Sequence, residues 1–158
     1  MKKYLRSLFI FLFFVALASS SYAVENKQAP AFQLTDLNGK VVFLSDYKDK
    51  QAVILFFWTT WCPFCREELK RLNQEYAGLT KDAIEVLAID VGESKSKVDN
   101  FVKTRNLTFK VLLDKDNTVA DAYELMGVPT YIVINKSGQV VSTSNNFPKD
   151  TLKELANK

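Results

Sequence analysis

Apolar and polar positions follow two different patterns along the chain, short apolar runs and longer amphipathic stretches. Short apolar runs with strand character lie at residues 41–44, 52–58, 84–91, 109–113, 130–134 and 139–142. The run at 52–58 is apolar and aromatic, as expected of a central strand that is buried on both faces. Residues 135–138 provide a turn, so the last two runs are predicted to form a hairpin.

Longer amphipathic stretches separate these runs and are predicted to be helices at residues 63–76, 94–104, 118–125 and 149–157. In the first stretch, Leu69, Leu72 and Tyr76 recur at intervals of three and four residues between charged side chains. Gly78 is expected to help end this helix, and Ser94 is expected to cap the next one. Alternation of strands with helices predicts a single α/β domain.

The first 23 residues have the pattern of a signal peptide. Three basic residues precede an apolar run at 8–18, and the triplet Ser21-Tyr22-Ala23 has small residues at the two positions that a signal peptidase inspects. We expect cleavage after Ala23, a linker at 24–28 and one domain at 29–158. The alternative is an uncleaved anchor, although the run is shorter than the ~20 residues of a membrane-spanning helix. Either interpretation predicts a periplasmic or otherwise extracytoplasmic domain.

The amino-acid composition excludes several classes of function. The chain of 158 residues contains no histidine, which excludes Ser-His-Asp and Cys-His catalysis, histidine-ligated metals and a Cys-x-x-Cys-His haem site. We therefore expect no metal and no cofactor. The net charge of +3 equals the three basic residues before the apolar run, so the domain itself is neutral. A neutral domain has no basic surface for nucleic acid, and we expect a monomer.

Two cysteines, Cys62 and Cys65, lie where the buried run at 52–58 passes into the first helix. Two intervening residues allow thiols in a first helical turn to form a disulfide, and a cysteine at the amino end of a helix is favoured as the thiolate. The thiolate is the nucleophile of disulfide exchange. We predict that Cys62 attacks a disulfide of another protein and that Cys65 resolves the mixed disulfide.

Other uses of this pair stay open. A structural bridge around two residues would restrict the unfolded chain little, and half of a zinc site would lack its other ligands. A thiol peroxidase is an alternative because Thr59-Thr60-Trp61-Cys62 contains a Thr-x-x-Cys arrangement, but an immediate second cysteine better fits a dithiol exchanger. A non-catalytic chaperone or binding module would instead use a rim of Trp61, Phe64 and Pro129.

Trp-Cys-x-x-Cys after a buried strand, with Gly127-Val128-Pro129-Thr130 further along, resembles thioredoxin. Residues 91–95, the helix after them and residues 109–114 resemble the insertion of the branch that contains TlpA, ResA and CcmG/DsbE, which are extracytoplasmic reductases. The likeness covers roughly residues 29–143. It implies a thioredoxin-like fold, with a central mixed β-sheet flanked by helices, an N-terminal extension and this insertion.

The resemblance also assigns supporting residues. It implies a cis peptide bond between Val128 and Pro129 beside the dithiol, where the Val128 backbone can pair with an extended substrate segment. Trp61 is expected at the rim of the site. Pro63 and Phe64, which separate the two cysteines, influence the stability of the thiolate.

One departure from thioredoxin concerns proton transfer. Phe56 occupies the position at which thioredoxin has a buried aspartate that helps to move the proton of the resolving cysteine. Glu68, which matches a glutamate frequent in the branch, and Asp90, at the carboxyl end of a predicted strand, are the candidate acids. Their plainer interpretations are a helix-surface charge and a strand-end cap.

The physiological role that the resemblance implies is reduction of protein disulfides such as those of apocytochrome c before haem attachment. The expected electron donor is a thiol reductase embedded in the membrane. Dithiol exchange follows from the residues themselves, whereas this substrate and this donor follow from the resemblance.

Overall fold

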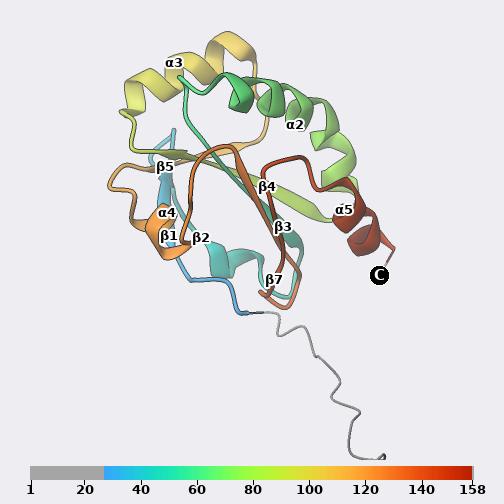
Figure 1. The fold of residues 1–158 in the computed structure, drawn as a ribbon. Helices are drawn as coiled ribbons and strands as arrows, with labels where there is room; N and C mark the ends of the chain where they lie inside the picture. Colours follow the sequence, from blue (N-terminus) through green and yellow to red (C-terminus); the bar gives the residue numbers. More distant parts are fainter. Residues whose placement is uncertain (1–26, 158) are drawn as a thin grey trace, which may run out of the picture.

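The computed structural model describes residues 27–157, so the predicted signal peptide and linker residues 24–26 lie outside the described part of the chain. Seven strands form one sheet in the order β2-β1-β5-β4-β3-β6-β7 (Figure 1). They are β1 (Gln33–Asp36), β2 (Val41–Phe43), β3 (Ala52–Trp58), β4 (Ile84–Val91), β5 (Lys110–Asp114), β6 (Thr130–Ile134) and β7 (Val140–Ser144). The pairs β3·β4 and β4·β5 are parallel and the other pairs are antiparallel, so the sheet is mixed, as predicted.

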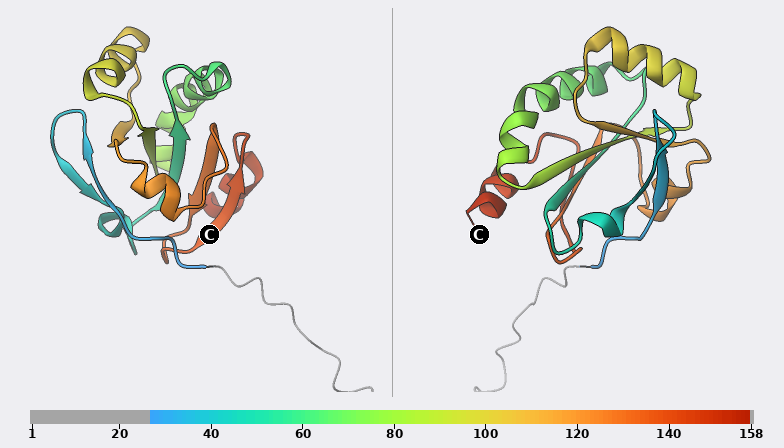
Figure 2. Two further views of the ribbon diagram at one scale, coloured as in Figure 1. Left: turned by 60° about the vertical axis from the view of Figure 1, so that its left-hand side comes forward. Right: turned by 180° about the vertical axis from the view of Figure 1, so that it is seen from behind.

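Helices cover both faces of this sheet. They are the 3-10 helix η1 (Leu44–Tyr47) and the α-helices α2 (Pro63–Lys81), α3 (Lys95–Arg105), α4 (Thr118–Ala122) and α5 (Lys149–Ala156). Buried side chains of α2, α3 and α5 belong to one apolar cluster, and those of η1 and α4 belong to the other. Figure 2 shows α2 and α3 side by side on the same side of the sheet. Within residues 27–157, no helix combines the length and the apolar character needed to cross a membrane.

Strand β3 joins the two apolar clusters because it is buried at every position. Ile54, Phe56 and Trp58 point to the cluster under α2, while Leu55 and Phe57 point to the opposite cluster. Complete burial of such a side chain contributes about 1.5–3 kcal/mol. The strand is therefore firmly anchored up to Trp58, immediately before the segment that carries the cysteines.

Several predicted element ends were wrong. Helix α2 continues through Gly78 to Lys81, because Leu79 is buried in the core and secures the last turn. Helix α4 ends at Ala122 instead of residue 125, and Glu124 adopts a left-handed φ of 52° that no α-helix can include. Ser94 is at the N-cap of α3, but its side chain makes no capping hydrogen bond. Strand β1, four residues with little apolar pattern, was not predicted.

Candidate active site

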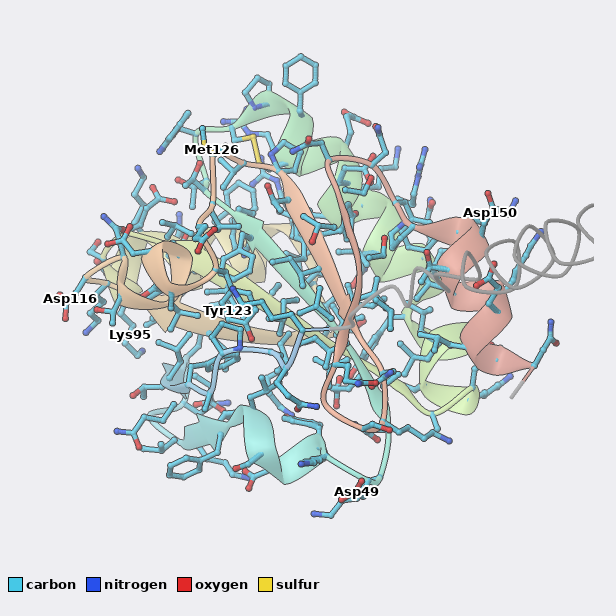
Figure 3. All side chains as sticks on the ribbon, turned by 60° about the horizontal axis from the view of Figure 1, so that its bottom comes forward. Asp49, Lys95, Asp116, Tyr123, Met126 and Asp150 are labelled. Carbon is cyan, nitrogen blue, oxygen red and sulfur yellow. A yellow bond between two sulfur atoms is a disulfide. The ribbon has the colours of Figure 1, made fainter. Side chains whose placement is uncertain are left out.

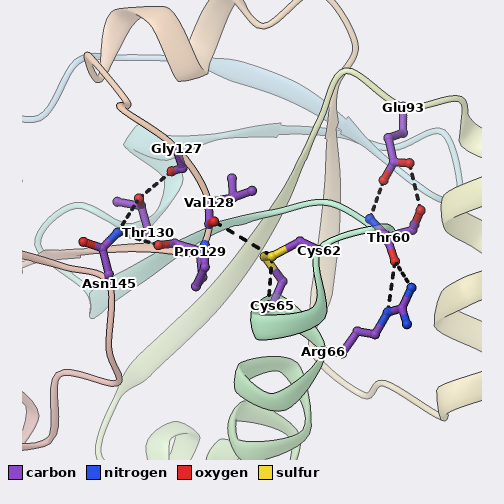
Figure 4. Close-up of a disulfide and its surroundings, with 10 residues drawn as sticks. All are labelled: Thr60, Cys62, Cys65, Arg66, Glu93, Gly127, Val128, Pro129, Thr130 and Asn145. Carbon is purple, nitrogen blue, oxygen red and sulfur yellow. Dashed lines mark hydrogen bonds between the residues drawn. A yellow bond between two sulfur atoms is a disulfide. The ribbon is translucent and has the colours of Figure 1, made fainter.

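The predicted dithiol lies at the amino end of α2 and forms a disulfide (Figure 4). Cys62 is the N-cap residue, and its Sγ accepts a hydrogen bond from the backbone N–H of Cys65 at 3.1 Å. Pro63 is the first helical residue, where its missing N–H removes no helical hydrogen bond. Local sequence therefore explains why the helix starts here with one sulfur at its end and the other one turn inside.

This position favours negative charge on Cys62 once the disulfide is reduced. The positive end of a helix dipole stabilises an anion by about 0.3–1 kcal/mol, and the N–H of Cys65 adds a direct donor. Cys65 is completely buried, whereas 3% of the surface of Cys62 is exposed to solvent. The geometry therefore suits Cys62 as the sulfur that meets another protein.

The loop before β6 lies beside the disulfide. The peptide bond between Val128 and Pro129 is cis, as the sequence resemblance implied, and the Val128 carbonyl oxygen is 3.9 Å from Cys62 Sγ. Asn145 holds this loop by donating to the Pro129 carbonyl at 2.7 Å, and the Thr130 hydroxyl donates to the carbonyl of Gly127. Asn145 was missed by sequence reasoning, because it follows β7 and reaches the loop only through the folded hairpin.

Large apolar side chains are exposed around the cysteines. Trp61 is 64% exposed, Phe64 is 74% exposed and Met126 is fully exposed. Figure 3 shows Met126 at the same end of the molecule as the disulfide. Exposed apolar groups gathered at one place mark an interaction surface. A single methionine in a loop makes no sequence pattern, so Met126 was not predicted.

Polar contacts hold the segment between β3 and α2 from two sides. The carboxylate of Glu93 accepts from the backbone N–H of Thr60 and, at 2.8 Å, from its hydroxyl. Arg66 donates from Nε and Nη2 to the Thr60 carbonyl, at 3.2 and 3.0 Å. Lys97 forms an ion pair with Glu93. These contacts fix the backbone two residues before Cys62, and sequence analysis did not identify any of these four residues as part of the site.

Glu93 is ionised in this setting. Its burial alone would raise its pKa, but hydrogen bonds from Lys97, from the Thr60 backbone and from Asp90 outweigh burial and lower the pKa to about 2. Across the physiological range the site therefore contains a fixed negative charge, neutralised by Lys97 and directed at the Thr60 backbone.

Asp90, the first candidate acid, is completely buried at the carboxyl end of β4. Burial, followed by its hydrogen bond to Glu93 and the negative charge there, raises the pKa of Asp90 to about 8. The group is therefore protonated at neutral pH, which a solvated strand-end cap would not be. A part in proton transfer stays a prediction.

Glu68, the second candidate, lies on α2 and accepts a hydrogen bond from the Tyr131 hydroxyl at 2.7 Å. The ring of Tyr131 packs on Phe56 with its centroid 4.5 Å away, so this pair borders the position where thioredoxin has its aspartate. The Glu68 side chain is only 14% exposed, unlike an ordinary helix-surface charge. Its role in proton transfer is likewise still a prediction.

Known proteins resemble this chain in sequence. Residues 26–143 match the AhpC/TSA family. The thiol-disulfide oxidoreductase ResA of Bacillus subtilis is 44% identical over 117 residues, which cover 74% of this chain and 65% of that protein, less than two thirds of its length. ResA of Bacillus thuringiensis subsp. konkukian is 37% identical over 133 residues, covering 84% of this chain and 76% of that one.

Solved structures resemble it in fold. StoA from Bacillus subtilis has a TM-score of 0.68 at 26% identity, over 80% of this chain and 96% of that chain. A secreted disulfide oxidoreductase of Mycobacterium tuberculosis, homologous to Escherichia coli DsbE, has a TM-score of 0.68 at 27% identity, over 85% and 98%. Both likenesses extend over most of each chain, and the fold is thioredoxin-like.

Proposed function

Because the chain belongs to the AhpC/TSA family and has ResA thiol-disulfide oxidoreductases among its relatives, we propose that it reduces protein disulfides outside the cytoplasm through Cys62 and Cys65. The observation that carries this proposal is the place of Cys62 Sγ, at the amino end of α2 and 3.9 Å from the Val128 carbonyl. A nucleophilic sulfur there meets an extended segment that pairs with the Val128 backbone.

The exchange takes two steps that conserve electrons and protons. The Cys62 thiolate attacks one sulfur of the partner's disulfide; that bond breaks, a mixed disulfide forms, and the released partner sulfur takes up a proton. Cys65, after giving up its proton, attacks Cys62 Sγ and forms the Cys62–Cys65 disulfide, while the second partner sulfur leaves and is protonated. Two electrons pass to the partner; Cys65 gives up one of the two protons that the partner takes up, and solvent supplies the other, because Cys62 reacts as the thiolate.

Resolution requires a group that accepts the proton of Cys65. Asp90 and Glu68 are the proposed groups, because both are buried or nearly buried carboxyls in or next to the apolar cluster that contains Cys65. Because the pKa of Asp90 is about 8, only its ionised fraction, which grows as the pH rises toward 8, accepts this proton.

The proposed substrates are disulfide-containing proteins such as apocytochrome c, reduced before haem attachment, with a membrane thiol reductase as the electron donor. The predicted signal peptide at residues 1–23 supports export, either as a soluble protein after cleavage or as an anchored one. The exposed rim of Trp61 and Phe64 supports contact with an unfolded segment that carries apolar side chains.

Two measurements test this function. The equilibrium reduction potential, read by tryptophan fluorescence in defined thiol-disulfide buffers, should lie well below ~−220 mV; a value near the ~−120 mV of a strong oxidant would contradict a reductase. With an oxidised peptide containing Cys-x-x-Cys-His, Cys65→Ser should accumulate a mixed disulfide, and Cys62→Ser should not. Consumption of hydrogen peroxide would favour a peroxidase, and full function of Cys62→Ser would favour a binding module.

A further inference from the structure

In the described part of the chain, four buried polar atoms have no hydrogen-bond partner, and they belong to three residues at or just after the ends of β3 and β4. They are Nε1 of Trp58, Oγ1 of Thr59 and both carboxyl oxygens of Asp90. Such atoms are rare in folded proteins because each costs free energy, so these atoms call for a functional explanation. Trp58 and Asp90 are register partners on the parallel strands β3 and β4, and therefore face the same side of the sheet.

Asp90 lies between residues of two neighbouring strands. Trp58 flanks it on β3 and Leu113 is its register partner on β5, and both are apolar residues of the cluster that contains the two cysteines. The charged groups that act on Asp90 are Glu93, in the turn after β4, and Lys97 on α3. Arg66, the charged residue that reaches this region from α2, donates to the Thr60 carbonyl.

Neither carboxyl oxygen of Asp90 receives a hydrogen bond, and Asp90 can pair with Glu93 only if one of the two is protonated, since two carboxylates can only accept. Glu93 already accepts hydrogen bonds from the Thr60 backbone, from the Thr60 hydroxyl and from Lys97, and these donors stabilise its ionised form. The proton therefore belongs on Asp90, which becomes the donor.

A hydrogen bond from Asp90 to Glu93 would act on the segment that carries the nucleophile. Glu93 holds Thr60, two residues before Cys62, and the Cys62 N–H donates to the Thr59 carbonyl at 3.4 Å. A movement of Glu93 would therefore displace the segment that presents Cys62 (Figure 4).

We propose that Asp90 is a positioning residue whose protonated carboxyl donates to Glu93, and that this contact keeps Glu93 on Thr60 and Cys62 in its place at the end of α2. Loss of the Asp90 proton puts two negative charges side by side, loosens Glu93 from Thr60 and makes the Cys62 thiolate less stable. This inference rests on the proposed dithiol exchange for its effect on chemistry, but the pairing of Asp90 with Glu93 does not involve the thiols and is testable in the oxidised protein. The pKa of Asp90, about 8 for the reasons given above, makes both states accessible just above neutral pH.

The test is an NMR titration of the Thr60 amide in the oxidised protein between about pH 6 and pH 9, a range that brackets the expected transition. No cysteine titrates in this form, so the result does not depend on the proposed function. A charge-assisted hydrogen bond moves an amide proton downfield. We expect the Thr60 resonance to shift with a midpoint near pH 8 in the wild type. Asp90→Asn should abolish the shift, because its amide group donates to Glu93 at every pH. Asp99→Asn, which changes a half-buried acid of α3 paired with Lys103, should titrate like the wild type.

The reduced protein provides the second readout, the rate of Cys62 alkylation by iodoacetamide. Wild type and Asp90→Asn should react equally at pH 6.5, where Asp90 is protonated in the wild type. Near pH 8 the wild type should react more slowly, by up to roughly fivefold, the effect of weakening one charge-assisted hydrogen bond while the thiolate is still forming. At higher pH both thiolates are complete and the two rates should converge. A Thr60 resonance that does not respond to pH in the wild type overturns the proposal without any variant. Slower alkylation with an unmoved Thr60 resonance also overturns it, because Asp90 would then act through its charge alone. Failure to reduce any disulfide, with the titration as expected, would count against the proposed function instead.

Discussion

Replacement of Asp90 by asparagine should stabilise the folded protein at alkaline pH, although it changes a completely buried polar residue. In the unfolded chain the carboxyl ionises around its ordinary pKa of 3.8, whereas burial and Glu93 raise the pKa to about 8 in the fold. The folded state therefore binds this proton more tightly. Its contribution to stability is fully present below about pH 4 and is lost progressively as the pH rises toward 8. Asparagine does not titrate, so the variant avoids this loss.

The size of this stability loss follows from the two pKa values of Asp90, in the unfolded chain and in the fold. Between pH 5 and pH 8 the unfolded Asp90 is ionised and the folded one stays largely protonated, which lowers the stability of the wild type by at most ~1.4 kcal/mol per pH unit, or about 4 kcal/mol. Because Glu93 and Lys97 can rearrange around an ionised neighbour, we expect about half of this ceiling, roughly 2 kcal/mol. The lowered pKa of Glu93 affects stability only between about pH 2 and pH 4.5, below this window.

The assay is urea unfolding of the oxidised wild type and Asp90→Asn at pH 5 and at pH 8. The difference between their free energies of unfolding should move by roughly 2 kcal/mol in favour of the variant at the higher pH. Asp99→Asn, which changes another acid of α3, is the matched control and should show no such change. A difference that stays constant within about 0.5 kcal/mol would mean that Asp90 ionises in the fold as it does in the unfolded chain, and the reasoning from burial would be wrong.

Substitutions at three further positions test contacts around the site. Thr60→Val removes the hydroxyl bond to Glu93 and should cost about 2 kcal/mol of unfolding free energy in urea, whereas Thr60→Ser keeps the donor and should cost less than half as much. Tyr131→Phe removes only the hydroxyl bound to Glu68 and should cost about 1 kcal/mol; an unchanged stability would show that this bond contributes nothing. Leu69→Ala opens the core beneath the disulfide and should cost about 2–5 kcal/mol, seen as a lowered Tm, and a loss below 1 kcal/mol would contradict tight packing there.

Most strands and the amino end of α2 were predictable because their causes are local. Strands β3, β4 and β6 have the predicted bounds, since apolar runs bordered by breaks suffice to define buried strands. Pro63 and the two-residue spacing between the cysteines set the helix start and the disulfide within one turn. Where local signals were weak or opposed by packing, as at β1 and Gly78, the prediction failed. Leu79 in the core outweighed the ~1 kcal/mol that a glycine costs inside a helix.

The sequence alone predicted an α/β domain with a dithiol at the end of a helix. It also identified two carboxyl side chains, Glu68 and Asp90, as candidates for proton transfer. Only the tertiary structure decided the burial, the hydrogen-bond partners and the pKa of each carboxyl group. Glu93 and Thr60 are 33 residues apart and meet because β3 and β4 are neighbours. Asp90 is buried because Trp58, Leu113 and α3 surround it, and no local pattern contains those neighbours. Periodicity determines which way a side chain points, whereas its pKa and hydrogen bonds depend on distant segments that the fold brings together.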